Sequence, residues 1–163
     1  MPLEIAPPTA LPRVHKGRGG VGTPTVLIAD DDEDFRFALA ELLAEEGHRV
    51  VDVQDGEAAL AVLEAAAKGR GRVPDLFVLD LLMPKMSGIE VLQRLRKSAR
   101  WAKLPVLVMT GVNDPMLRVR LDLPIVFKPE IDVVLEAARQ QLSFHRQHQG
   151  ERATLEKAAG SAP

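Results

Sequence analysis

The chain has 163 residues, enough for one domain with its own core and too few for two large domains. Hydrophobic residues make up 46% and charged residues 27%, which is typical of a globular protein. The absence of cysteine excludes disulfides and thiolate metal sites. No apolar run reaches the roughly 18 residues needed to span a bilayer. We therefore expect a cytoplasmic protein without membrane insertion.

Charge is unevenly distributed along the chain. The net charge is −2, whereas residues 25–142 carry −5, because residues 1–24 carry +2 and residues 143–163 carry +1. A nucleic-acid-binding protein would gather lysine and arginine on one face, so we expect no nucleic-acid partner. Five prolines and four glycines predict a flexible leader over residues 1–24. The tail, residues 143–163, is predicted to be flexible or partly helical.

Short apolar runs alternate with helical patterns between the leader and the tail. The runs are rich in Val, Leu and Ile, which predicts strands buried on both faces: Val26–Ala29, Val50–Val53, Leu76–Leu79, Val106–Met109 and Ile125–Phe127. Helical spacing follows most of these runs, over residues 35–43, 56–69, 89–95 and 131–142. Asp32 is predicted to cap the first helix, and Gly47 to end it. This order predicts an open α/β sheet with helices on both faces.

Polar residues stand directly after most of the predicted strands. Asp30 and Asp31 follow the first strand, Asp80 the third, Thr110 the fourth and Lys128 the fifth. Because the carboxyl ends of parallel strands lie at one edge of a sheet, where ligands bind in such folds, these side chains are expected to converge. The sequence therefore predicts a site with three carboxylates, one hydroxyl and one ammonium.

Three carboxylates that lie this close repel one another strongly. A hard divalent cation relieves the repulsion, and Mg²⁺ suits one or two carboxylates together with water and a phosphoryl oxygen. Mn²⁺ is the alternative ion. Asp80 can then attack phosphorus as a nucleophile. Lys128 would neutralise the charge that develops on the phosphoryl oxygens, and Thr110 would donate a hydrogen bond to one of them.

The region from Thr25 to Leu142 resembles the receiver domain of two-component response regulators. The resemblance rests on an acidic pair after strand one, an Asp after strand three with Pro and Gly four and eight positions later, a Thr after strand four and Lys-Pro after strand five. The matching residues are Asp30, Asp31, Asp80, Pro84, Gly88, Thr110, Lys128 and Pro129.

The resemblance implies a flavodoxin-like, doubly wound domain over residues 25–142, with five parallel strands in the order 2-1-3-4-5. It also implies that Asp80 is the phosphoacceptor and Asp31 a direct Mg²⁺ ligand. Asp30 would hold a metal-bound water, and the main-chain carbonyl of Leu82 would complete the metal site.

The implied function is that of a stand-alone response regulator in a phosphorelay. A histidine kinase or a histidine phosphotransfer protein would supply the phosphoryl group. Output would be contact with a downstream protein, which is unknown, or relay of the phosphoryl group. The protein would not be an enzyme beyond its own phosphorylation and slow dephosphorylation.

Two departures from the family pattern affect signalling and lifetime. The segment between Thr110 and Lys128 is short and contains Pro115, which predicts a shortened fourth helix of one or two turns within residues 114–120. Ile125 stands where the family usually has Tyr or Phe, so the usual ring rotation cannot report phosphorylation. Leu82 and Val112, two positions after Asp80 and Thr110, are apolar and cannot orient an attacking water, which predicts slow self-dephosphorylation.

Two alternative functions fit part of this pattern. The altered segment after Thr110 is compatible with a receiver-like interaction module that phosphorylation does not switch. Asp30 and Asp32 also fit the D-x-D pattern of aspartyl-phosphate phosphatases, although the chain leaves no room for a cap domain over the substrate. A calcium-binding loop is excluded, because Phe35 occupies the position where that loop requires glycine.

Overall fold

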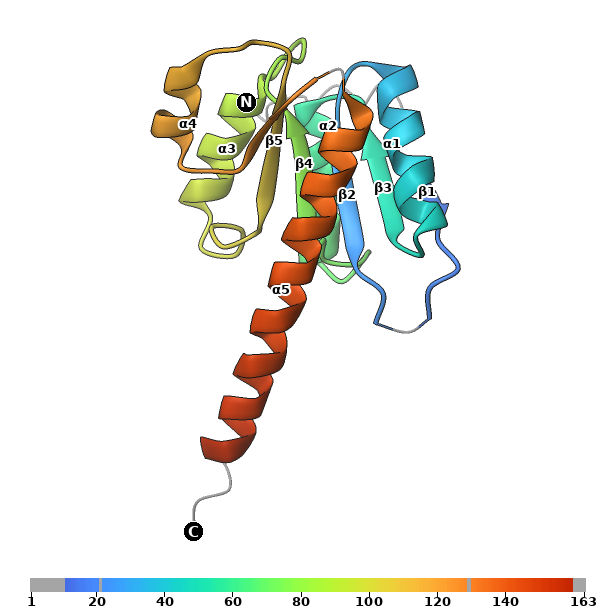
Figure 1. The fold of residues 1–163 in the computed structure, drawn as a ribbon, viewed down its shortest axis with the longest axis vertical. Coiled ribbons are helices and arrows are strands. Elements are labelled where there is room, and N and C mark those ends of the chain that lie inside the picture. Colours follow the sequence, from blue (N-terminus) through green and yellow to red (C-terminus); the bar gives the residue numbers. More distant parts are fainter. Residues whose placement is uncertain (1–10, 21, 129, 160–163) are drawn as a thin grey trace, which may run out of the picture.

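The computed structural model describes residues 11–20, 22–128 and 130–159 and shows a mostly parallel sheet between two layers of helices (Figure 1). All five predicted strands form: β2 (Thr25–Ala29), β3 (Arg49–Val53), β4 (Leu76–Asp80), β5 (Val106–Thr110) and β6 (Ile125–Phe127). They are parallel and lie in the order β3-β2-β4-β5-β6. The predicted flavodoxin-like order, 2-1-3-4-5, is therefore confirmed.

The described residues form five helices, which cover the two faces of the sheet: α1 (Glu33–Glu45), α2 (Gly56–Ala67), α3 (Gly88–Lys97), α4 (Pro115–Leu121) and α5 (Ile131–Ala159). Successive strand residues point to opposite faces, so β2 places Val26 and Ile28 against α1 and α5. Leu27 and Ala29 point the other way, against α2 and α3. β2, β4 and β5 show no alternation of apolar and polar residues because both of their faces are buried.

The ends of α1 follow the sequence prediction. Asp32 is the N-cap, and its side chain accepts a hydrogen bond of 3.1 Å from the N–H of Phe35. Glu33 and Asp34 occupy the first turn, where the helix dipole favours negative charge. Gly47, which follows the end of the helix, has φ +96°, a left-handed conformation that glycine adopts without strain.

The sheet has a sixth strand, which the sequence did not predict and which lies within residues 1–24, the predicted flexible leader. β1 (Arg13–Lys16) pairs antiparallel with β3 along the outer edge of the sheet (Figure 1). Its sequence, RVHK, lacks the apolar run by which the other strands were predicted. Residues 1–10 and Val21 lie outside the described part, and the predicted domain bounds stay predictions.

The last two helices differ in how closely they match expectation. α4 is short, as predicted, with Asp114 as its N-cap and Pro115 in its first turn. α5 continues well past residue 142 and extends away from the sheet (Figure 1). The described tail is thus helical as far as Ala159, and residues 160–163 lie outside the described part. No described helix is long and apolar enough to cross a membrane.

Candidate metal centre

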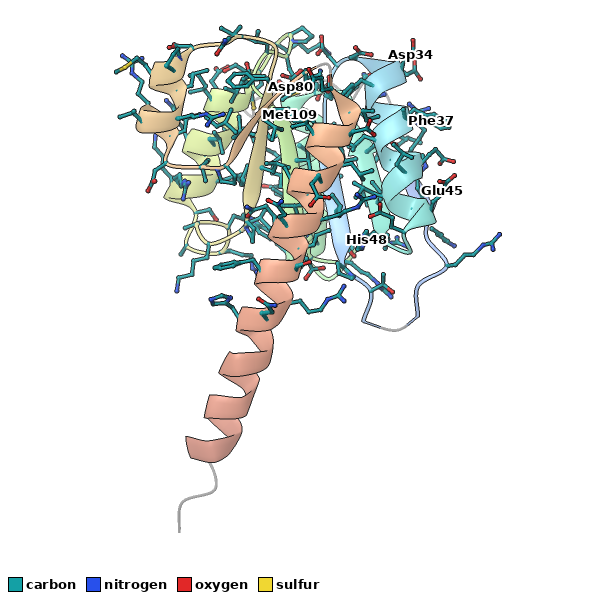
Figure 2. The ribbon with its side chains drawn as sticks, viewed as in Figure 1. Asp34, Phe37, Glu45, His48, Asp80 and Met109 are labelled. Carbon is teal, nitrogen blue, oxygen red and sulfur yellow. The ribbon has the colours of Figure 1, made fainter. Side chains whose placement is uncertain are left out.

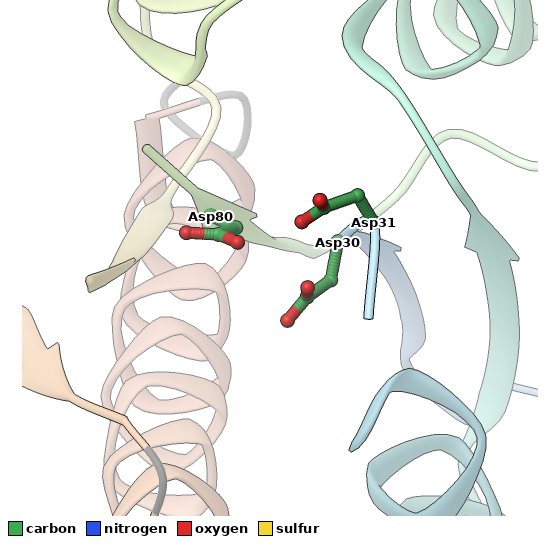
Figure 3. Close-up of side chains that lie close together, drawn as sticks. All are labelled: Asp30, Asp31 and Asp80. Atoms are coloured by element: carbon green, nitrogen blue, oxygen red, sulfur yellow. The ribbon is translucent and has the colours of Figure 1, made fainter. Parts of the chain in front are cut away.

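The carboxyl ends of β2 and β4 bring three aspartates together. These strands are parallel neighbours, with Ala29 paired to Leu79, so the residues that follow this pair, Asp30 and Asp80, emerge side by side. One carboxylate oxygen from each of Asp30, Asp31 and Asp80 lies within 4.8 Å of the other two. Figure 3 shows the three side chains turned toward a common space. The predicted convergence of the acidic residues is therefore found in the structure.

The three carboxylates differ in exposure and in hydrogen bonding. Asp30 is fully buried and Asp80 is 4% exposed, whereas Asp31 is exposed. Asp30 Oδ1 accepts a hydrogen bond of 2.9 Å from the N–H of Asp32. Asp80 Oδ1 accepts one of 3.1 Å from the N–H of Leu82. Main-chain donors thus hold one oxygen of each buried carboxylate and leave the second oxygen directed to the site.

Lys128, which follows β6, supplies the positive charge. Its Nζ lies 2.6 Å from Asp30 Oδ2 and 3.4 Å from Asp80 Oδ2. The ammonium also lies 4.8 Å from the centre of the Phe35 ring, a cation–π distance. The N–H of Lys128 donates to the carbonyl of Thr110 at 3.0 Å, which ties the lysine to the end of β5. One ammonium therefore lies between two buried carboxylates from different segments of the chain and offsets only part of their negative charge.

Burial and the charges at the site shift the pKa values of Asp80 and Lys128. Burial, followed by the negative charge of Asp30, raises the pKa of Asp80 to about 6, and Lys128 opposes this shift. Burial works against the Lys128 ammonium, but its hydrogen bond to Asp30 and the charges of Asp30 and Asp80 raise its pKa above the ordinary value. The lysine stays charged at neutral pH. The net charge around Asp80 is still negative, and a bound cation would offset it.

Thr110 and Leu82 flank the aspartates. Thr110 is the last residue of β5 and is 1% exposed, and its Oγ1 accepts a hydrogen bond of 3.1 Å from the N–H of Val112. Leu82 directs its side chain to solvent and is 58% exposed. Pro129, another residue of the sequence motif, lies outside the described residues. The roles predicted for the Thr110 hydroxyl and the Leu82 carbonyl stay predictions.

Gly88 shows why the loop after Asp80 needs a glycine. A Cβ at this position would lie 2.2 Å from the carbonyl oxygen of Asp80 and 2.8 Å from the Cα of Leu81. The N–H of Gly88 donates to the carbonyl of Leu81 at 2.9 Å. The start of α3 therefore packs directly on the backbone of Asp80, and any larger residue would displace one of them.

The structure shows a polar network beside the site that the sequence did not predict. Arg36 on α1 donates from Nη1 to the carbonyl oxygen of Asp30 at 2.6 Å and from Nε to Asp52 Oδ1 at 2.6 Å. Asp52 on β3 also lies 2.6 Å from His15 on β1. A signal was present, because Asp52 interrupts an apolar strand run and a buried carboxylate requires a partner. The sequence alone does not name that partner.

The fold and the site together define a class of protein. A doubly wound sheet that gathers aspartates, a threonine and a lysine at its carboxyl edge has the architecture of a receiver domain in two-component signalling. The sequence profile described as the response regulator receiver domain matches residues 26–122, more than half of the chain. The chain belongs to this family.

Curated relatives of the chain are larger signalling proteins. The transcriptional regulatory protein AfsQ1 of Streptomyces coelicolor is 37% identical over 91 residues, which cover 56% of this chain and 36% of that protein. The hybrid signal transduction histidine kinase D of Dictyostelium discoideum is 36% identical over 98 residues, 60% of this chain and 6% of that protein. The chain thus spans little more than a third of the first relative and a small fraction of the second.

Solved structures share the fold. The receiver domain of the Francisella response regulator 1452 superposes with a TM-score of 0.64 at 25% identity, covering 74% of this chain and 98% of that chain. The chemotaxis protein CheY4 of Vibrio cholerae gives a TM-score of 0.63 at 25% identity, covering 72% of this chain and 98% of that one. The matching region in both comparisons is consistent with a receiver unit and additional chain beyond it.

Proposed function

We propose that this receiver accepts a phosphoryl group on Asp80 in a two-component phosphorelay. The observation that supports the proposal best is the arrangement of Asp80: a buried carboxylate within 4.8 Å of two others and 3.4 Å from the Lys128 ammonium. A purely structural carboxylate would be neutralised by its partner. Here the negative charge exceeds the positive charge, and Asp80 keeps a second oxygen, Oδ2, directed toward the site.

In the proposed reaction, Asp80 Oδ2 forms a bond to phosphorus while the bond from phosphorus to the donor breaks. The donor is the imidazole of a phosphohistidine or a small acyl phosphate, and the product is an aspartyl phosphate, an acid-labile mixed anhydride. Lys128 turns from Asp80 Oδ2 to a phosphoryl oxygen and neutralises its charge. The Thr110 hydroxyl, which is buried at the end of β5, donates to another phosphoryl oxygen.

The residues present fit a hard divalent cation. The donor set consists of carboxylate oxygens with a main-chain carbonyl, as Mg²⁺ prefers, with Mn²⁺ as the alternative ion. Asp31 and Asp80 would hold the ion with the carbonyl of Leu82. Asp30, whose two oxygens already accept from Asp32 and Lys128, would hold it through water. The cation, when bound, offsets the charge of the carboxylates and of the phosphoryl oxygens.

The donor is proposed to be a histidine kinase or a histidine phosphotransfer protein. The relatives support this class of partner, because one of them is named a transcriptional regulatory protein and another a hybrid histidine kinase. We expect the receiver to turn over no other substrate. The cytoplasmic location and the absence of nucleic-acid binding stay predictions from the sequence.

We propose residues 111–124 as the surface that conveys the phosphorylated state, through contact with a downstream protein or a relay partner. α4 lies in this segment and buries none of its residues. Met116 is 55% and Val119 76% exposed. Ile125 is buried beside this segment, which supports transmission by the segment itself and not by a rotating ring.

The experiment that tests the proposal is incubation with acetyl phosphate and Mg²⁺. We expect acid-labile phosphate on the wild-type protein and none on Asp80→Asn, with Asp75→Asn as a control that removes an aspartate away from the site. Failure of the wild type to incorporate phosphate contradicts the proposal. Incorporation without any change in partner affinity or oligomeric state favours the alternative function, an interaction module that phosphorylation does not switch. Release of phosphate from unrelated phosphate esters favours the phosphatase.

A further inference from the structure

The edge strand β1 is linked to the acidic site by a chain of short polar contacts. β1 lies outside residues 26–122, which match the receiver family, and follows the outer edge of β3 (Figure 1). Its His15 Nε2 lies 2.6 Å from Asp52 Oδ2. Asp52 Oδ1 in turn accepts from Arg36 Nε at 2.6 Å. Arg36 Nη1 donates to the carbonyl of Asp30, also at 2.6 Å.

We propose that β1 is a positioning element for the acidic site, and that His15 acts through Asp52 and Arg36 on the main chain of Asp30. The effect on phosphorylation rests on the function proposed above. The effect on the main chain of Asp30 is independent of that function, because it is measured in the metal-free protein. His15, Asp52 and Arg36 are positioning residues, since none of them is placed to contact the phosphoryl group.

Arg36 is the central residue of this chain of contacts. It is 5% exposed, and a buried guanidinium requires both a counter-charge and acceptors for its donors. Asp52 supplies the charge, and the Asp30 carbonyl is an acceptor at the point where β2 ends. Both hydrogen bonds come from one rigid, planar guanidinium. The orientation of the peptide between Asp30 and Asp31 therefore depends on the position of Asp52. A displacement of Asp52 shifts the segment that presents two of the three site carboxylates.

β1 determines the surroundings of Asp52. This carboxylate is 2% exposed although β3 would be the edge strand of the sheet without β1. Arg13 lies across from Asp52 in the ladder, with its Nε 3.6 Å from Asp52 Oδ1. The two ring nitrogens of His15 contact different carboxylates. Nε2 lies 2.6 Å from Asp52, and Nδ1 lies 2.6 Å from Glu41 on α1. β1 thus excludes water from the Asp52–Arg36 pair and strengthens it.

The first test is hydrogen exchange in the metal-free protein. The N–H of Asp32 donates to Asp30 Oδ1 and reports directly on the anchored segment. We expect His15→Ala to speed exchange of this amide at least about fivefold relative to the exchange of Leu79, a core strand amide that reports global opening. Lys16→Ala, which removes a side chain of the same strand that lies outside this network, should leave the ratio unchanged.

The second test is a double-mutant cycle with Arg36→Lys, which keeps the charge and loses the fork. If His15 acts through Arg36, the effect of His15→Ala on the Asp32 amide should disappear in the Arg36→Lys background. Equal effects of His15→Ala in both backgrounds contradict the proposal. So does a uniform change of exchange at Asp32 and Leu79, which indicates a role in global stability alone.

The third test connects the network to the site. We expect His15→Ala to weaken Mg²⁺ binding roughly tenfold, as for groups that orient metal ligands, and Lys16→Ala to leave the affinity unchanged, by calorimetric titration of folded protein. An affinity of His15→Ala within twofold of wild type contradicts the effect on the site. Absence of Mg²⁺ binding in the wild type itself contradicts the proposed function, and the exchange measurements then decide the role of β1.

Discussion

Asp80 lies between a repelling carboxylate, Asp30, and an attracting ammonium, Lys128, at the end of the sheet away from His48 (Figure 2). Its pKa is raised from 3.8 to about 6, mainly by burial and then by Asp30. The folded, metal-free protein therefore holds this proton more tightly than the unfolded chain does. Ionisation of Asp80 lowers the stability as the pH rises from about 4 to about 6, and the loss persists above pH 6.

Replacement of Asp80 by Asn removes this ionisation and should stabilise the metal-free protein at pH 7.5. The shift in pKa corresponds to an upper limit of about 3 kcal/mol in the free energy of unfolding. Urea unfolding at pH 4 and pH 7.5 measures the difference between Asp80→Asn and the wild type, which should be larger at pH 7.5. Asp132→Asn, an exposed control on α5, should show no such trend. A pH-independent difference contradicts the electrostatic account of the site.

The lifetime of the phosphorylated state is set, in this account, by two apolar residues. Leu82 and Val112 are 58% and 45% exposed beside the site, and neither can orient water by hydrogen bonding. Leu82→Gln supplies such a group and should shorten the half-life roughly tenfold, about 1.4 kcal/mol in activation free energy. Decay of acid-labile phosphate after removal of acetyl phosphate measures this. Leu82→Met is the apolar control, and equal decay in both variants contradicts the account.

At the scale of elements, the packing of α3 against β4 sets the backbone of Asp80. Gly88→Ala should lower the free energy of unfolding by about 2 kcal/mol or more, because its Cβ has no space beside the Asp80 carbonyl. Gly71→Ala is the matched control, since a Cβ there meets no atom within 4 Å. Thermal or urea unfolding of both variants checks the prediction, and equal stabilities contradict it.

The elements that the sequence predicts are those in which local pattern and burial agree. The apolar runs of β2, β4 and β5 are buried on both faces, and the caps Asp32 and Gly47 act within a few residues of their own position. β1 could not be predicted because three of its four residues are exposed and only His15 is half-buried, and because its position depends on pairing with a distant strand, β3. α5 extends past residue 142, where the sequence has no apolar stripe that would predict a helix.

The site shows the same division between local and distant information. The positions of Asp30, Asp31, Asp80 and Lys128 follow from one rule, that parallel strands end at a common edge. Arg36 could not be assigned, because its acceptor is a main-chain carbonyl six residues earlier and its counter-charge comes from β3. A sequence shows that a buried charge needs a partner, but the fold decides which residue is the partner.

At the scale of the whole molecule, the site must influence a surface to signal. We expect phosphorylation to shift amide resonances in residues 111–124 more than in α2, because Thr110 joins the site directly to that segment. Nuclear magnetic resonance spectra with and without acetyl phosphate measure the shifts. Asp80→Asn, which has no acceptor carboxylate, is the control and should show no shifts. Resonance shifts of equal size in residues 111–124 and in α2 contradict this prediction.

Asp80 is, in our proposal, the residue that receives phosphate. Borohydride reduces an aspartyl phosphate to homoserine, so reduction after treatment with acetyl phosphate and Mg²⁺, followed by peptide mass spectrometry, locates the modified residue. We predict homoserine at position 80 and unmodified aspartate at positions 30 and 31. Homoserine at position 30 or 31, or at none of the three positions, would contradict the account.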